Sequence, residues 1–77
     1  MTIDLDQPLP PYRQLAAILR DKITNGEIAS RLPSEKTLMQ DYGLALGTVR
    51  KALAVLRDEG VVQTTPGWGT YVADRSR

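Results

Sequence analysis

Hydrophobic residues at helical spacing mark the first ordered segment of the chain, after a start that has no periodicity. One face of this helix consists of Tyr12, Leu15, Leu19 and Ile23. Charged residues fall on the other faces, which is the pattern of an amphipathic helix. Pro11 suits its first turn, where the missing N–H has no partner to lose. Asn25 and Gly26 form a stop signal, so we expect a helix from residue 11 to about residue 25.

A second and a third helix follow on either side of a glycine. Ser34 is expected as the N-cap of the second helix, and Glu35 adds a negative charge near the positive end of the helix dipole. Gly43 ends this short helix. The next hydrophobic face consists of Leu46, Val49, Leu53 and Leu56. It predicts a helix within residues 44–59 that ends at Gly60, and two helices joined so tightly form a helix-turn-helix pattern.

The last part of the chain has the composition and turn residues of a β-hairpin. Residues 61–65 and 70–72 are rich in Val and Thr, and a turn at residues 66–69 separates them. An isolated hairpin is marginally stable, so it must dock on the helices or pair with another strand, for which residues 31–32 are the candidate. The predicted fold is mainly α, with three helices and one antiparallel hairpin.

These elements divide the chain into three predicted segments. Residues 1–10 contain Pro8 and Pro10 without any periodicity and are expected to form a flexible or extended arm. Residues 11–73 hold all the predicted elements and form one domain, in keeping with a length of 77 residues. Residues 74–77 remain as a C-terminal tail.

Composition excludes several classes of protein. The chain contains no cysteine and no histidine, so disulfide bonds and zinc sites of the usual kind are excluded, and we expect no cofactor. No apolar run approaches the roughly 20 residues that span a bilayer. The acidic, proline-rich start does not resemble a signal peptide, so we expect a cytoplasmic protein. The net charge of +1 is too small to identify a partner by itself.

The sequence offers almost no catalytic group. Without cysteine or histidine, the usual pairing of a nucleophile with an imidazole base is impossible. Asp58 and Glu59 are neighbours, so on a helix their side chains diverge and do not face one substrate. The run 67–69 is too short, and wrongly placed, for a glycine loop that holds phosphate. We therefore predict that the protein is not an enzyme.

The third helix is the candidate contact surface for DNA. In helix-turn-helix proteins the second helix of the pair lies in the major groove and presents its N-terminal residues to the bases. The candidate residues there are Leu46, Gly47, Thr48, Arg50 and Lys51. Thr48 and Arg50 can donate to phosphates or base edges, and an arginine can pair with guanine through two hydrogen bonds. The alternative is that Arg50 and Lys51 only form a solvated helix face.

Two further features suit a nucleic acid. The second helix begins at Ser34, and its N-terminus, with Lys36 nearby, suits a phosphate; the alternative is a plain cap and a solvated lysine. The predicted turn places Trp68 between Gly67 and Gly69, which allow close approach of the backbone. An exposed Trp68 could lie in a minor groove or wedge between base steps. The alternative is that its ring folds onto a core that has few other aromatic side chains.

Five short runs of the sequence occur in a characteristic order. They are 32–36 (LPSEK), 43–44 (GL), 48–53 (TVRKAL), 56–62 (LRDEGVV) and 67–72 (GWGTYV). Together they resemble the DNA-binding domain of the GntR family of bacterial regulators, and the opening PYRQL is similar to its HutC and YtrA branches. The resemblance covers about residues 8–73, and the ordered set is far more specific than any single run.

The resemblance implies a winged helix-turn-helix fold that binds an operator in double-stranded DNA, usually as a homodimer on a palindromic site. It implies a recognition helix over about residues 45–59 in the major groove and a wing over residues 64–71 at the minor groove. The positions that match contacts of the family are Lys36, Thr48 and Arg50 on the helices, and Gly67 and Trp68 at the tip of the wing.

Three departures from the family pattern bear on these roles. The family commonly has Ser and then Arg where this chain has Ala45 and Leu46, and alanine is the poorer N-cap by about 1 kcal/mol. Leu46 cannot replace the arginine's base contact, although it can touch a thymine methyl, and Gly47 lowers helix propensity. The loop 27–31 is shorter than usual, so the first strand is expected to be shifted or absent. Trp68 stands where a basic wing residue is frequent.

We therefore predict sequence-specific binding to double-stranded DNA by a transcription regulator, with repression as the expected outcome. The alternative is a winged-helix module that binds another protein, as an antirepressor or assembly partner, because Leu46 and an exposed Trp68 suit a protein interface. Family members usually continue into a C-terminal effector-binding domain, so this chain is either a fragment or a small stand-alone protein. We expect no small-molecule effector to bind residues 1–77.

Overall fold

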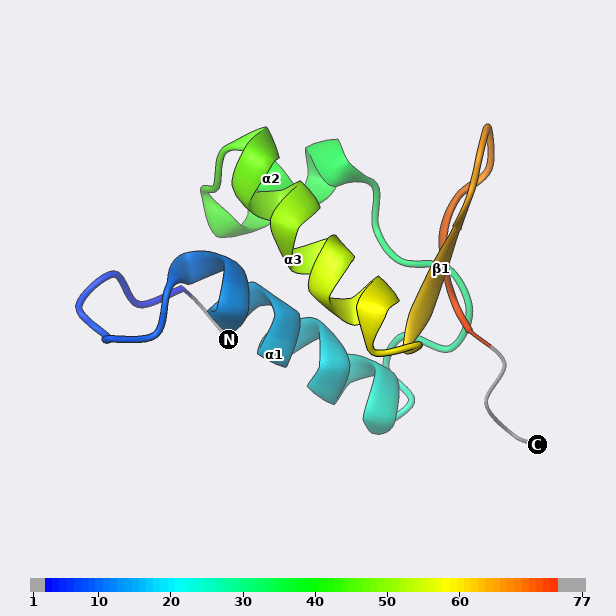
Figure 1. Ribbon diagram of the computed structural model, residues 1–77, viewed down its shortest axis with the longest axis horizontal. Coiled ribbons are helices and arrows are strands. Elements are labelled where there is room, and N and C mark those ends of the chain that lie inside the picture. Colours follow the sequence, from blue (N-terminus) through cyan, green and yellow to red (C-terminus); the bar gives the residue numbers. More distant parts are fainter. Residues whose placement is uncertain (1–2, 74–77) are drawn as a thin grey trace.

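The computed structural model describes residues 3–73 and contains three helices followed by a hairpin (Figure 1). The helices are α1 (Pro11–Thr24), α2 (Glu35–Tyr42) and α3 (Leu46–Asp58), and the strands are β1 (Val62–Thr65) and β2 (Gly69–Val72). This is the predicted fold, and it is a winged helix-turn-helix. The predicted C-terminal tail, residues 74–77, and the first two residues of the predicted arm lie outside the described residues.

Local signals place the boundaries of the helices. Pro11 is the first residue of α1, as predicted, because a proline at this position loses no backbone hydrogen bond. The side chain of Ser34 caps α2, since its Oγ accepts from the N–H of Thr37 at 3.1 Å. Gly43 ends α2 in the left-handed conformation, with φ of 65°, which glycine adopts without steric strain. Ala45 precedes α3 and makes no side-chain cap.

Replacing Ser34 with alanine is expected to lower the free energy of unfolding by about 1 kcal/mol, because one backbone N–H of α2 loses its partner. Urea denaturation followed by circular dichroism measures this difference. Ser30→Ala is the matched control, because Ser30 is an exposed serine of the same loop but is not the N-cap of a helix. An equal effect of both substitutions would contradict the capping role of Ser34.

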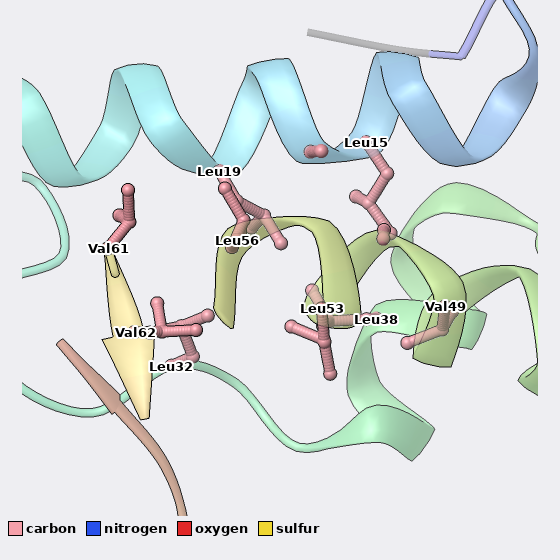
Figure 2. Close-up of a cluster of buried hydrophobic side chains, with 11 residues drawn as sticks. Leu15, Leu19, Leu32, Leu38, Val49, Leu53, Leu56, Val61 and Val62 are labelled. Carbon is pink, nitrogen blue, oxygen red and sulfur yellow. The ribbon is translucent and has the colours of Figure 1, made fainter. Parts of the chain in front are cut away.

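The hydrophobic core lies around α3, which packs against α1, α2 and β1. Figure 2 shows the leucines of α1 and α3 facing one another, with Val61 and Val62 closing one end of the cluster. The fully buried large side chains are Leu15, Leu19, Leu38, Val49 and Leu56. The helical periodicity in the sequence identified Leu15, Leu19, Val49 and Leu56, because each of them lies on the inward face of its helix.

The hairpin is antiparallel, and Val62 pairs with Val72 at the end nearest the core. The loop before α2 adds a single bridge, between Arg31 and Tyr71. Two backbone hydrogen bonds flank this bridge, from Leu32 N–H to Thr70 O at 2.9 Å and from Val72 N–H to Ser30 O at 2.6 Å. The predicted first strand is therefore only one bridge long. Within the described residues no further bridge follows it, and α2 already begins at Glu35.

The first part of the chain is anchored to α1 by one buried polar side chain. The amide of Gln14 accepts from the N–H of Asp4 at 2.7 Å and donates to the carbonyls of Asp4 and Leu9 at 2.6 and 2.8 Å. Gln14 is the buried polar residue of the core region, and these bonds satisfy its whole amide group. Residues 4–9 are thus tied down at both ends, and the flexibility expected of the arm stays a prediction.

Candidate nucleic-acid interface

Two adjoining hollows separate the hairpin from α2 and α3. The first, which we call the wing groove, has a volume of about 320 Å³. It is lined by residues 31–35, Leu53, residues 64–67, Gly69 and Thr70. The second, which we call the arginine groove, has a volume of about 340 Å³ and is lined by Glu35, Arg50, Leu53, Arg57, Thr64 and Thr70. The start of α2, one face of α3 and the hairpin therefore border one continuous concave surface.

Arg50 projects from α3 and forms an ion pair with the first residue of α2. Its Nε lies 3.0 Å from Oε2 of Glu35, and its Nη2 lies 3.4 Å from Oε1 of the same carboxylate. The Arg50 side chain is still 63% exposed. Such an exposed pair adds less than about 1 kcal/mol to stability, so its main effect is to orient the guanidinium. The predicted contact residue is therefore neither free nor buried.

Lys51 lies on a different side of α3. Its Nζ is 4.5 Å from the centre of the Tyr12 ring at the start of α1, a distance suited to a cation–π contact. Successive helical residues are turned by about 100°, so Arg50 and Lys51 cannot both face the arginine groove. The structure brings Arg50 to this groove and does not bring Lys51 there.

The first turn of α3 is accessible, as a recognition helix requires. Leu46 is 36% exposed, Gly47 is exposed and Thr48 is half-buried. In α2, Lys36 follows Glu35 and is also exposed. None of these four residues lines either hollow, so they extend the accessible surface beyond the grooves.

Arg57 also belongs to this surface, although it is not among the residues predicted above. Its Nη1 donates to Oγ1 of Thr64 in β1 at 3.2 Å, and that hydroxyl lies 3.4 Å from Oγ1 of Thr70 in β2. Spacing could have identified Arg57, because it follows Arg50 by two helical turns and so shares its face of α3. The ion pairs within residues 3–73 are Arg20–Glu59, Lys22–Glu27 and Arg50–Glu35. Within that range Arg57 has no carboxylate partner.

The tip of the hairpin presents Trp68 to solvent. Trp68 is 67% exposed, so the alternative in which its ring folds onto the core is wrong. The N–H of Trp68 donates to Thr65 O at 3.0 Å, and Gly67 between them has φ of 80°, which closes a tight turn. Gly69 has φ of 110°, which only glycine adopts readily. The turn lies at the end of the hairpin away from Val62, so the ring cannot reach the core.

The described residues contain no cluster of acidic side chains that could hold a metal ion. Within residues 3–73, no helix is both long and apolar enough to cross a bilayer. The surface around the two grooves thus offers hydrogen-bond donors, hydroxyls and one exposed aromatic ring. This combination suits a polyanion with accessible sugar and base edges.

Comparison with known proteins agrees with this geometry. The sequence model described as "Bacterial regulatory proteins, gntR family" matches residues 7–72. The chain is 40% identical over 70 residues to YdfD, an HTH-type transcriptional regulator of Bacillus subtilis, covering 88% of this chain and 14% of YdfD. It is 37% identical over 75 residues to NagR, a transcriptional repressor of the same organism, covering 95% of this chain and 31% of NagR. The chain thus spans less than a third of the length of these relatives.

Solved structures give the same result. The DNA-binding domain of AraR in complex with operator ORX1 superimposes with a TM-score of 0.85 at 31% identity, covering 95% of each chain. YtrA of Sulfolobus acidocaldarius, described as a GntR-family transcription factor, superimposes with a TM-score of 0.83 at 32% identity. That alignment covers 97% of this chain and 80% of YtrA.

Proposed function

Because the chain belongs to the gntR family of bacterial regulatory proteins, we propose that residues 11–73 bind double-stranded DNA and select their sequence. In this proposal α3 lies in the major groove and the hairpin tip lies at the adjacent minor groove. The observation that carries it is the concave surface on which Arg50, Arg57 and the exposed wing converge. AraR, whose DNA-binding domain has this fold, is known in complex with operators, which supports the proposal.

The proposal assigns different contacts to different parts of the surface. Arg50 contacts base edges, and Leu46, Gly47 and Thr48 approach the floor of the major groove with it. Lys36 and the hydroxyl of Ser34, which flank Glu35 in the sequence, bind phosphate together with Arg57. The turn residues Gly67, Trp68 and Gly69 approach the minor groove. Lys51 contributes charge from the side of α3 that faces α1.

Four further parts of the proposal concern the regulatory outcome, the assembly, the location and the ligands of the protein. Repression fits a family whose members include NagR and MngR, both described as repressors. Binding as a homodimer to a palindromic site, a cytoplasmic location and the lack of an effector site in these residues remain predictions. No catalytic step is proposed, since the family and these relatives are transcription regulators.

The test is selection of bound duplexes from a randomised DNA pool at moderate salt, followed by sequencing. The proposal expects an enriched motif, and the spacing of its half-sites gives the geometry of a dimer. A variant in which Arg50 and Arg57 are both replaced by alanine serves as control and should enrich nothing. If the unaltered chain retains no DNA, the protein-interaction alternative replaces the proposal, with Leu46 and Trp68 as its contacts.

Replacing Trp68 with alanine is expected to weaken DNA binding while the melting temperature stays within about 2 °C, because the side chain is 67% exposed and lies outside the core. Fluorescence anisotropy at several salt concentrations measures the binding. The salt dependence should not change, since an indole releases no counterions from the phosphates. A fall in melting temperature as large as that of a core substitution would contradict the exposed position.

A further inference from the structure

Two arginines on the same face of α3 have different partners. Arg50 is paired with the carboxylate of Glu35 through two contacts, at 3.0 and 3.4 Å. Arg57 lies two turns further along and is bound to the Thr64 hydroxyl, with no carboxylate partner within residues 3–73. Both line the arginine groove, so a DNA duplex at this groove would meet one compensated and one uncompensated positive charge.

We propose that Glu35 is a positioning residue that determines specificity: it holds the Arg50 guanidinium for a base edge and keeps phosphate away from it. This inference rests on the proposed function, because it assigns a role within the same DNA-binding surface. It predicts that the discrimination between DNA sequences depends on Glu35 although Glu35 itself need not touch a base.

The ion pair with Glu35 leaves free the edge of the Arg50 guanidinium that can pair with guanine. Glu35 occupies the edge formed by Nε and Nη2 of Arg50. The opposite edge, formed by Nη1 and Nη2, keeps outward-facing N–H groups, and it can donate two parallel hydrogen bonds to O6 and N7 of guanine. Because both oxygens of the carboxylate are engaged, the guanidinium plane cannot rotate freely. A planar donor that is oriented before binding loses less entropy when it pairs.

The negative charge of Glu35 also favours base contacts of Arg50 over phosphate contacts. An arginine without an acidic neighbour binds any phosphate, which gives affinity without sequence preference. The carboxylate cancels much of the Arg50 charge and repels a phosphate that approaches the same place. Arg57, which has no such neighbour, is the better phosphate ligand of the two.

The competing explanation is that the pair only ties α2 to α3. The chain contains a control for this possibility, because Arg20 and Glu59 form a second two-contact pair, at 3.0 and 2.8 Å, between α1 and the end of α3. The two carboxylates are exposed to a similar degree, 42% for Glu59 and 41% for Glu35, but Arg20 and Glu59 line neither groove. Glu59→Gln therefore removes an equivalent ion pair away from the proposed DNA surface.

The experiment compares Glu35→Gln and Glu59→Gln with the unaltered chain, on the selected duplex and on a scrambled duplex, over a range of salt. For Glu35→Gln we expect tighter binding to the scrambled duplex, with a salt slope steeper by about one unit. The ratio of the two affinities should fall by roughly fivefold or more, as expected when one base-contacting arginine loses its orientation. The ratio is measured on one preparation, so a partly unfolded fraction does not change it.

Each outcome decides between the possibilities. Unchanged affinity ratio and salt slope for Glu35→Gln, as for Glu59→Gln, would overturn the inference while the proposed function stands. Equal binding of both duplexes by the unaltered chain would overturn the proposed function, and this inference with it. A fall in the ratio for Glu35→Gln alone is the result that supports the positioning role.

Discussion

Replacing Leu56 with alanine is expected to lower the free energy of unfolding by about 2–5 kcal/mol. Leu56 is fully buried in α3 and lies between α1 and the start of the hairpin (Figure 2). Its loss removes apolar contacts and leaves a cavity that neighbours from several elements can fill only in part. A small domain is stable by only about 5–15 kcal/mol, so this substitution removes a large share of the total. Denaturant unfolding, monitored by circular dichroism, measures the change.

Leu46→Ala is the matched control for this prediction, since it makes the same chemical change in the same helix. Leu46 is 36% exposed and lies in the first turn of α3, where little packing is lost. We expect a change within about 0.5 kcal/mol, typical of surface positions. A loss for Leu56→Ala as small as that for Leu46→Ala would contradict the buried position of Leu56.

The fold could be predicted almost completely because its signals are local. Hydrophobic periodicity identified the inward face of each helix, and the ends of α1 and α2 follow from Pro11, the Ser34 cap and Gly43. The strand before α2 could not be predicted in the same way. Its single bridge depends on where the loop before α2 meets β2 in space, which no pattern within the loop indicates.

The candidate site was predicted less completely, because it depends on how elements meet. The contact of Arg50 with Glu35 joins two helices, and no spacing within one helix indicates it. The 100° turn between neighbours on a helix does show that Arg50 and Lys51 face different ways, and the two-turn spacing does point to Arg57. The exposure of Trp68 could not be decided from composition, since a core poor in aromatics could equally have accepted it.

Replacing Arg50 with alanine is expected to weaken binding to the selected duplex by roughly 1–3 kcal/mol and to relax its base preference. The loss has two sources, because the substitution removes a donor to the bases and also leaves Glu35 without its partner. An unpaired carboxylate in the groove repels the phosphates of any duplex. We therefore expect the scrambled duplex to bind more weakly as well, although by less. Anisotropy titrations of both duplexes measure the two effects.

Two further variants distinguish the lost base contact of Arg50 from the repulsion by the unpaired Glu35 carboxylate. In the double variant Glu35→Gln, Arg50→Ala the repulsion is absent, so affinity for the scrambled duplex should recover while base preference stays relaxed. Arg57→Ala changes the same residue type on the same face of α3, but as a phosphate ligand it should weaken both duplexes equally and lower the salt slope by about one unit. If Arg50→Ala instead behaved like Arg57→Ala, with its base preference intact, Arg50 would be a second phosphate ligand and α3 would select its sequence through other residues.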